Sequence, residues 1–561
     1  DCTAGSGTDT IDITVDISLD VIDHDYMALP APTEAIILQG NNHSITRIGV
    51  TDMDLLDEPE DITIQELSIS GFSRNSGNTG SGLIECINSN CRIVLTDVEF
   101  INNTDGVIDS DISTGAGEWI FTNVTLLNNS STTGGIMHSG FARNITITNL
   151  TATGNSSSSG IDGGILTYTG AGSGIIEISD SLFSDNSTHG FGAALGVSLY
   201  GGVTTVNINN TTFESETSDN SGGDLSIEGN NVSLNIDSSL FNGGIANSNG
   251  GAIYIQDTVS TTITNSTFYN NTAITGNGGA IYVGDGGLTT GSFHASHNTF
   301  YNNSAGSNLG ADLFHTPNDA DVSEFENNIF SGTSDDCAGD FTNISFTNNL
   351  SGDSDCGPIA TGSGIDSSLV DNGGSTKTLA LLAISNAVNT GVSGILGCPA
   401  TDARGTTRPS GVACDIGSFE FVNTTPADIS LSDLYVPEKE SVGTPVGTLT
   451  ATDADLTDTH TYSLSCAVAG VDDSSFSISV DELLSAESFD YETKSSYSVC
   501  IRVTDISNAT YDENFTITVT EEESSSSGSS SGPSAPTNPT PPVDPVVPIP
   551  VVPVAPTLPV V

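Results

Sequence analysis

A repeating unit constrains the fold of this chain more than any other feature of the sequence. The unit consists of a Phe, a short Asn-rich run, a Gly-Gly-Ala-Ile segment and a second polar stretch. Phe241, Phe268 and Phe300 open successive copies, at separations of 27 and 32 residues. A period in this range is typical of stacked supersecondary units, each of which buries its apolar side against its neighbours.

The repeat extends over residues 60–350, and its glycine-rich half recurs at residues 134–136, 163–166, 192–195, 222–225 and 310–313. In the other copies, the position of the opening Phe is occupied by Phe72, Phe100, Leu126, Ala152, Phe183, Phe213 and Phe330. Between these points lie short alternating segments with strand periodicity, and none with convincing helical periodicity. The sequence therefore predicts an all-β fold, a parallel β-helix with Phe, Ile and Leu stacked inside. Ten or so coils at ~4.8 Å each would form a rod of roughly 50 Å.

The charge of the chain limits its partners. Ten Lys and Arg residues stand against 70 Asp and Glu residues, which gives a net charge of −60. Such a charge excludes nucleic acid and anionic membrane surfaces as partners. No stretch has the length and apolarity of a membrane span. Because the sequence opens at Asp1 without Met, we expect that a targeting segment has been removed.

Cysteine spacing favours an oxidising, extracellular setting. The cysteines fall as sequence neighbours that we expect to form disulfides, and no spacing matches a zinc site. Cys2 is left over, either free or bonded to another chain. The expected pairs are Cys86 with Cys91, Cys337 with Cys356, Cys398 with Cys414, and Cys466 with Cys500.

Asn-x-Ser/Thr acceptor sequences for N-glycosylation occur along the whole chain. Many lie at expected coil corners, where Asn can alternatively form ladders between coils. The sequence predicts a glycoprotein with its acceptors among Asn42, Asn102, Asn123, Asn128, Asn129, Asn144, Asn149, Asn155, Asn186, Asn209, Asn210, Asn231, Asn265, Asn270, Asn302, Asn343, Asn349, Asn423, Asn508 and Asn514.

Residues 325–421 differ from the repeats and carry four motifs in order. These are the DNGG run at 371–374, the SNAVNTG run at 385–391, DARGTTRP at 402–409 and the CDIGSFE close at 414–420. The set resembles the end of the bacterial choice-of-anchor Q domain, a right-handed parallel β-helix family of secreted and surface proteins. The shorter repeats also resemble those of chlamydial polymorphic outer membrane proteins. We expect Lys377, Arg404 and Arg408 to pair with carboxylates that lock the last coils.

Residues 423–520 change to about seven antiparallel strands. The run at 436–455, FDYE at 489–492 and CIRVTD at 500–505 are similar to a cadherin repeat. The resemblance implies a Greek-key β-sandwich and Ca²⁺ bound by carboxylates at its poles. One implied set is Asp453, Asp455 and Asp505, and the other is Glu438, Asp490 and Glu492. At the second pole Lys439 departs from the family pattern, and residues 521–523 replace the usual linker.

The chain divides into an N-terminal cap with first coils (1–60), the β-helix (61–421), the cadherin-like sandwich (423–520), an acidic Ser/Gly linker (521–540) and an apolar Pro-rich tail (541–561). The prolines of the tail favour an extended conformation. Because the tail carries no charge after Asp544, we expect it to dock in a groove.

These features predict an extracellular structural protein of a cell surface or appendage, assembled head-to-tail through residues 541–561. The alternative is a monomeric surface adhesin that binds carbohydrate or protein. A polysaccharide lyase or hydrolase is the least favoured alternative. The basic and acidic residues of the repeats are isolated from one another, and the histidines fall at unrelated positions of the repeat. The sequence thus predicts a protein that is not an enzyme.

Overall fold

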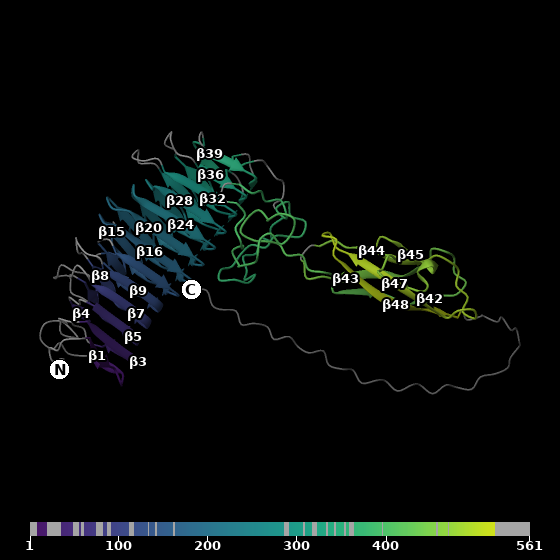
Figure 1. Ribbon diagram of the computed structural model, residues 1–561, viewed down its shortest axis with the longest axis horizontal. Helices are drawn as coiled ribbons and strands as arrows, with labels where there is room; N and C mark the ends of the chain where they lie inside the picture. Colours follow the sequence, from purple (N-terminus) through teal and green to yellow (C-terminus); the bar gives the residue numbers. More distant parts are fainter. Residues whose placement is uncertain are drawn as a thin grey trace, which may run out of the picture.

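The computed structural model describes residues 8–19, 35–48, 55–57, 61–73, 82–86, 91–110, 117–132, 134–140, 143–160, 163–284, 291–306, 309–316, 323–332, 335–341, 344–352, 355–357, 364–394, 397–455, 458–468 and 470–521. Three parallel sheets wind into a β-helix of about 10 turns, followed by a loop-rich segment and a β-sandwich (Figure 1). The prediction of an all-β parallel β-helix is confirmed.

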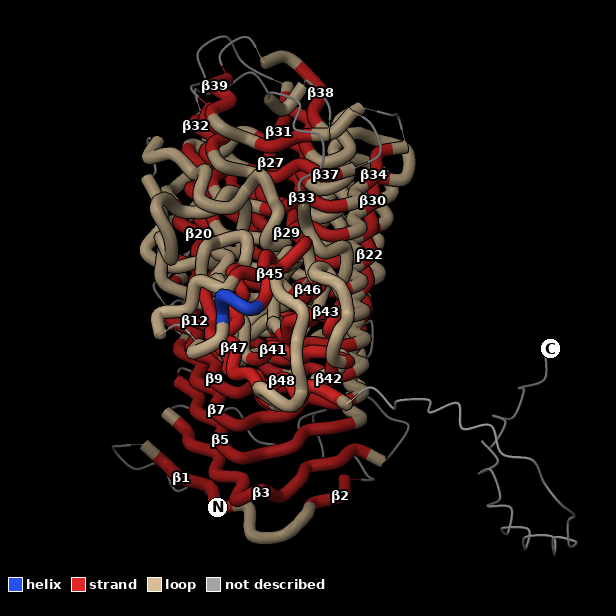
Figure 2. The backbone as a smooth tube through the Cα atoms, turned by 90° about the vertical axis from the view of Figure 1, so that its right-hand side faces the viewer, coloured by secondary structure: helices blue, strands red, loops and turns tan. Residues whose placement is uncertain are grey.

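The first sheet of the β-helix has 22 strands, which stack as a ladder along the rod (Figure 2). The strands are β1 (Asp9–Asp12), β2 (Ile17–Leu19), β3 (Ile36–Arg47), β5 (Asp61–Ser70), β7 (Arg92–Ile101), β9 (Glu118–Leu127), β12 (Asn144–Thr148), β13 (Thr151–Thr153), β16 (Gly174–Ser179), β17 (Leu182–Ser184), β20 (Thr204–Asn209), β21 (Thr212–Glu214), β24 (Val232–Asp237), β25 (Leu240–Asn242), β28 (Ser260–Thr264), β29 (Thr267–Tyr269), β32 (Ser292–Ser296), β33 (Thr299–Tyr301), β36 (Ser323–Glu326), β37 (Ile329–Ser331), β39 (Ile344–Thr347) and β40 (Leu350–Ser351).

The second sheet has 7 short strands and the third has 11. The second comprises β10 (Ser130–Ser131), β14 (Ser156–Ser157), β18 (Ser187–Thr188), β22 (Thr217–Ser218), β26 (Ile245–Ala246), β30 (Thr272–Ala273) and β34 (Ser304–Ala305). The third comprises β4 (Leu56–Asp57), β6 (Ile84–Glu85), β8 (Ile108–Ser110), β11 (Met137–Ser139), β15 (Leu166–Gly170), β19 (Leu195–Leu199), β23 (Leu225–Glu228), β27 (Ile253–Gln256), β31 (Ile281–Gly284), β35 (Leu313–His315) and β38 (Cys337–Gly339).

The repeated Phe builds a ring stack through the core. The register places Phe100, Leu126, Ala152, Phe183, Phe213, Phe241, Phe268, Phe300 and Phe330 in one column. Ring centroids lie 4.8 Å apart between Phe241 and Phe268, and 4.7 Å apart between Phe268 and Phe300. The prediction that Phe72 belongs to this column is wrong. It is buried, but the register places Ile69 opposite Phe100, so Phe72 lies beyond this column.

The glycine-rich half of each repeat leads into the third sheet. Gly222 has a φ of 71°, and a Cβ there would lie 2.1 Å from the carbonyl oxygen of Leu225. Only glycine adopts this conformation at low cost with so little space. The repeated Gly therefore marks a corner of the coil.

An asparagine ladder runs inside the β-helix. Asn129 Nδ2 donates to Asn155 Oδ1 at 3.0 Å, and Asn155 Nδ2 donates to Asn186 Oδ1 at 2.9 Å. Asn186 then donates to Glu216 Oε1 at 2.8 Å, where the ladder stops. Because these amides also donate to buried backbone carbonyls, they satisfy polar groups that would otherwise destabilise the core.

The regular coils end with β40, where the repeats of residues 60–350 also end. Within residues 364–421 the described residues form only isolated bridges. This segment folds back along the flank of the β-helix (Figure 1). Asn265 Nδ2 donates to the carbonyl of Thr401 at 3.2 Å, and the hydroxyls of Thr299 and Ser418 lie 3.1 Å apart. The chain therefore leaves the rod from its side.

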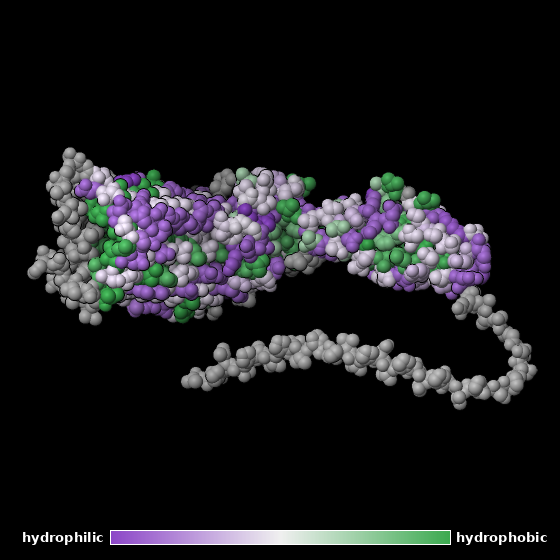
Figure 3. Space-filling model, turned by 90° about the horizontal axis from the view of Figure 1, so that it is seen from below, coloured by the Kyte–Doolittle hydropathy of each residue, from purple (hydrophilic) through white to green (hydrophobic). Residues whose placement is uncertain are grey.

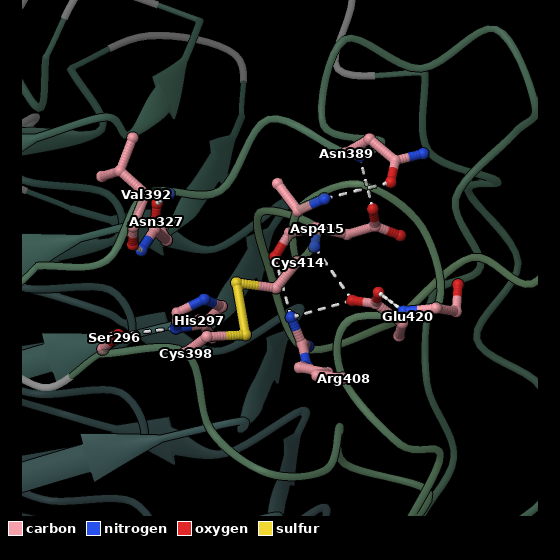
Figure 4. The surroundings of a disulfide bond; sticks show 12 residues. Ser296, His297, Asn327, Asn389, Val392, Cys398, Arg408, Cys414, Asp415 and Glu420 are labelled. Atoms are coloured by element: carbon pink, nitrogen blue, oxygen red, sulfur yellow. Dashed lines mark hydrogen bonds and ion pairs between the residues drawn. A yellow bond between two sulfur atoms is a disulfide. The ribbon is translucent and has the colours of Figure 1, made fainter.

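The three cations of this segment pair with carboxylates. Arg408 contacts Glu420 at 3.5 Å with both side chains fully buried, and Arg404 contacts Asp402 at 2.7 Å. Lys377 makes an exposed contact with Glu214 of the β-helix at 3.9 Å. Arg408 also donates to the carbonyls of Asp415 and Gly417, next to the Cys398–Cys414 disulfide (Figure 4).

The sandwich consists of two four-stranded sheets. One holds β41 (Asp428–Leu431), β43 (Pro445–Thr452), β45 (Phe476–Ser479) and β46 (Glu482–Ser485). The other holds β42 (Tyr435–Pro437), β44 (Thr461–Ser463), β47 (Ser496–Thr504) and β48 (Thr510–Thr520), and a 3₁₀ turn, η1, spans Asp473–Ser475. Its core is built by Leu483, Val499, Ile501 and Ile517, all fully buried.

All four predicted disulfides are present. They join Cys86 to Cys91, Cys337 to Cys356, Cys398 to Cys414 and Cys466 to Cys500. Cys2 and residues 541–561 lie outside the described residues. Among the described residues, no helix is long and apolar enough to cross a membrane.

Candidate metal centres

Glu438, Asp490 and Glu492 meet at the pole of the sandwich that follows β42. Their carboxylate oxygens lie within 4.8 Å of one another. Hydrogen bonds from Thr493 and Glu492 lower the pKa of Asp490, which keeps this carboxylate charged. However, Lys439 Nζ lies 2.7 Å from Glu438 Oε1. The lysine ammonium therefore neutralises the one buried carboxylate of this cluster, which weakens the attraction of the cluster for a metal ion.

The other pole faces the linker from the β-helix. Asp453 and Asp455 follow β43, and Asp505 follows β47. Thr424 bridges the first two, because its hydroxyl lies 3.1 Å from Asp453 Oδ1 and its N–H donates to Asp455 Oδ2 at 2.8 Å. Asn423 Nδ2 donates to Asp505 Oδ2 at 2.9 Å. All three predicted acids thus contact residues 423–424.

The three-residue group with converging ligand atoms at this pole differs from the predicted set. It consists of Asp453, Asp458 and His460, whose atoms lie within 4.8 Å of one another. His460 Nε2 lies 3.1 Å from Asp453 Oδ2. Asp458 and His460 were missed in the sequence. Both follow the Asp-x-Asp motif within a few residues, and this spacing is the signal that could have indicated them.

Two oxygen atoms at this junction lack a hydrogen-bond donor among the described residues. They are Asp458 Oδ2 and Asn423 Oδ1, and both are buried. Asp458 Oδ1 accepts from Ile506 N at 3.2 Å, next to Asp505, which Asn423 contacts. A buried oxygen without a donor costs free energy unless a cation or water satisfies it. Carboxylate and amide oxygens are the ligand atoms that Ca²⁺ prefers.

The charge state of Asp453 suits cation binding. Burial acts to raise the pKa of this carboxyl, but hydrogen bonds from Asp455 N–H, His460 and Thr424 outweigh burial, and the net pKa is lowered. Asp453 is therefore ionised at neutral pH. His460 helps to orient it, and as a nitrogen ligand it would be a poor ligand for Ca²⁺.

A third group, His297 with Cys398 and Cys414, does not form a metal site. The two sulfur atoms are joined in a disulfide, which removes their thiolates (Figure 4). His297 Nδ1 lies 2.7 Å from the Ser296 hydroxyl. Burial, followed by the charge of Arg408, lowers the pKa of His297 to about 3, so the ring is neutral.

The structure separates the predicted glycosylation acceptors into accessible and inaccessible ones. Five are at most 3% exposed, and their side chains occupy ladders or contacts within the fold, which corrects the prediction for Asn129, Asn155, Asn186, Asn265 and Asn349. Asn343 lies outside the described residues. The exposed acceptors are Asn42, Asn102, Asn123, Asn128, Asn144, Asn149, Asn209, Asn270, Asn302, Asn508 and Asn514, and the half-buried ones are Asn210, Asn231 and Asn423.

Comparison with known proteins identifies one part of the chain. Residues 432–520 match the Cadherin domain family. A solved structure of the extracellular cadherin domains 1–4 of protocadherin gamma B7 aligns at 22% identity with a TM-score of 0.15, covering 18% of this chain and 26% of that one. No curated protein matches the chain. The sandwich is therefore cadherin-like, and with the disulfides it indicates an extracellular protein of the adhesion type.

Proposed function

We propose that this chain is an extracellular adhesion-type protein in which a rigid β-helix carries a cadherin-like module through a junction ordered by Ca²⁺. The observation that carries the proposal is the junction itself. Asp453, Asp455 and Asp505 contact the linker residues 423–424, and oxygens of Asp458 and Asn423 there lack hydrogen-bond donors among the described residues. A cation held there would fix the module on the rod.

The residues that would hold the ion are Asp453, Asp455, Asp458 and Asp505, with the Asn423 amide oxygen. Bound Ca²⁺ would supply positive charge that offsets the repulsion between these carboxylates. Cell-surface placement agrees with the resemblance of residues 371–420 to the choice-of-anchor Q domain. The prediction that the protein is not an enzyme stays a prediction.

Removing calcium tests this function. We expect Ca²⁺ at ~100 times its Kd to stabilise the sandwich by about 2.7 kcal/mol, seen as a higher melting temperature than in EDTA. Asp458→Asn should abolish this shift, because it removes a charge from the junction. Asp490→Asn, at the pole that Lys439 already neutralises, is the matched control and should keep the shift. An unchanged transition of the wild-type sandwich on addition of Ca²⁺ would contradict the proposal.

A second candidate function is assembly into a filament. Among the described strands, β1 and β2 pair only with β3, so the first coil presents a strand edge. Unpaired strand edges accept added strands. The uncharged sequence of residues 545–561 fits such an edge, and head-to-tail addition would propagate without closing.

Deleting residues 541–561 tests the filament. We expect the full chain to form polymers in electron micrographs and the truncated chain to remain monomeric with an unchanged melting temperature. A full chain that stays monomeric at high concentration, with and without Ca²⁺, would leave the monomeric adhesin as the function.

A further inference from the structure

The outer face of the third sheet carries a row of rings that ends in a hollow. Successive coils place Tyr254, Tyr282 and Phe314 in register, pointing away from the core. Their ring centroids lie 5.3 and 5.4 Å apart. In the two coils that precede Tyr254, the same column holds no ring: Ser226 and then Gly196 stand there instead. The change from rings to small residues opens the hollow.

The hollow has a volume of ≈ 300 Å³ and spans β15, β19 and β23. Phe191 forms one wall and lies 6.5 Å from the Tyr254 ring, between centroids. Tyr200, which is 86% exposed, lines the hollow at its mouth. The floor at Gly196 has no room for a side chain, because a Cβ would lie 2.9 Å from the Cα of Gly163. Aromatic rings thus bound a cavity with a flat floor.

Polar side chains also line the same hollow. Glu228 lines it and makes no hydrogen bond or ion pair to any described residue. Ser198 and Thr169 also line it; the Ser198 hydroxyl donates to the Tyr200 hydroxyl at 3.4 Å, and Thr169 Oγ1 lies 3.3 Å from His138 Nε2. Burial, followed by the charge of Asp257, raises the pKa of Glu228, which agrees with its sheltered position. A polar ligand would find both donors and acceptors here.

The surroundings of the hollow restrict the ligand. Strand β19 pairs with β15 and with β23, so its backbone has no free edge for a peptide strand. None of the described residues that line the hollow is Lys or Arg, and the chain carries a net charge of −60. An anionic polymer would therefore be repelled. On the face that Figure 3 shows, hydrophilic residues along the rod are mixed with scattered apolar ones.

We infer that this hollow is a binding site for a neutral oligosaccharide. Sugar rings present apolar C–H faces that pack on aromatic rings and hydroxyl groups that donate to carboxylates. Phe191 and Tyr200 would contact the faces, while Glu228 accepts hydrogen bonds from the hydroxyls. The row from Tyr254 to Phe314 continues the surface for a longer chain. This inference rests on the adhesion-type function proposed above and names its ligand class.

Calorimetric titration of the full chain with cellohexaose, xylohexaose, mannohexaose and chitohexaose tests the site, with oligogalacturonate as the acidic comparison. We expect at least one neutral oligosaccharide to bind and oligogalacturonate not to bind. Tyr200→Ala and Glu228→Gln should each weaken binding about tenfold, which corresponds to about 1.4 kcal/mol. The matched controls are Tyr435→Ala and Glu487→Gln, which change exposed residues of the sandwich and should bind normally.

The inference is overturned if no neutral oligosaccharide binds, if only oligogalacturonate binds, or if the site variants bind as well as the controls. Circular dichroism of each variant establishes that it is folded. Titrations in Ca²⁺ and in EDTA separate this site from the junction. Loss of the calcium-dependent melting shift with sugar binding intact would contradict the proposed junction alone.

Discussion

Replacing Arg408 by Met is expected to destabilise the protein by about 3–5 kcal/mol, the usual cost of removing one partner from a buried ion pair. Arg408 is fully buried with Glu420 and donates to the carbonyls of Asp415 and Gly417. Burial lowers the pKa of Arg408 while Glu420 acts to raise it, so the two charges depend on each other. Met keeps much of the volume but leaves Glu420 without its cation.

Urea unfolding followed by circular dichroism and by Trp119 fluorescence measures this effect. Trp119 lies in the β-helix core, so the two signals together report whether the coils unfold with residues 364–421, the segment that flanks them. Lys377→Met is the matched control. Its ion pair with Glu214 is exposed, and such pairs contribute at most about 1 kcal/mol. An Arg408→Met protein as stable as this control would mean that the segment does not lock the coils.

The β-helix could be predicted from the sequence because its period is repeated many times and each copy supports the others. Phe100, Leu126 and Ala152 share one column although only the first is aromatic, and spacing alone indicated it. Phe72 was placed wrongly because the loops between the first coils vary in length, so spacing no longer determines the register. The flanking segment, residues 364–421, has no periodicity, and its fold-back depends on contacts distant in sequence.

The candidate sites were predicted only in part. The Asp-x-Asp motif indicated Asp453 and Asp455, but their neighbours Asp458 and His460 lie in an irregular loop whose path the sequence does not determine. Asn-x-Ser/Thr sequences cannot distinguish exposed corners from core ladders, since Asn128 and Asn129 both match and only the first is exposed. The hollow at Gly196 depends on which residues of successive coils share a column. The sequence alone does not determine this register, so the hollow could not be predicted from it.

Raising the pH from about 4.5 to about 8 is expected to destabilise the β-helix through two buried acids. Glu216 ends the asparagine ladder, and Asp224 lies fully buried nearby. The next ladder position is Gly244, and a Cβ there would lie 2.6 Å from Asp224 Oδ2, so the aspartate fills the space. Glu216 Oε2 and both oxygens of Asp224 lack partners among the described residues. Two carboxylates cannot both be charged there, and both acids bind protons in the folded state.

Burial raises the pKa of Glu216 from 4.5 to about 8, and burial followed by the charge of Glu216 raises the pKa of Asp224. An acid with a raised pKa in the folded state stabilises the fold fully below its unfolded pKa. This stabilisation is lost as the pH rises through the folded pKa. Each pKa unit corresponds to about 1.36 kcal/mol, so the loss between pH 4.5 and about 8 amounts to several kcal/mol.

This pH dependence is measured from melting temperatures between pH 5 and pH 9, compared between the wild type and its variants. The double variant Glu216→Gln, Asp224→Asn carries neutral amides and should melt at a nearly constant temperature where the wild-type temperature falls. Glu214→Gln changes a half-exposed neighbour that accepts a hydrogen bond from Asn242 at 2.8 Å, and it should retain the wild-type slope. Equal slopes for the wild type and the double variant would mean that the buried acids are not the proton-binding groups. The slope would then have to come from other acids with raised pKa values, such as Asp415 in the flanking segment.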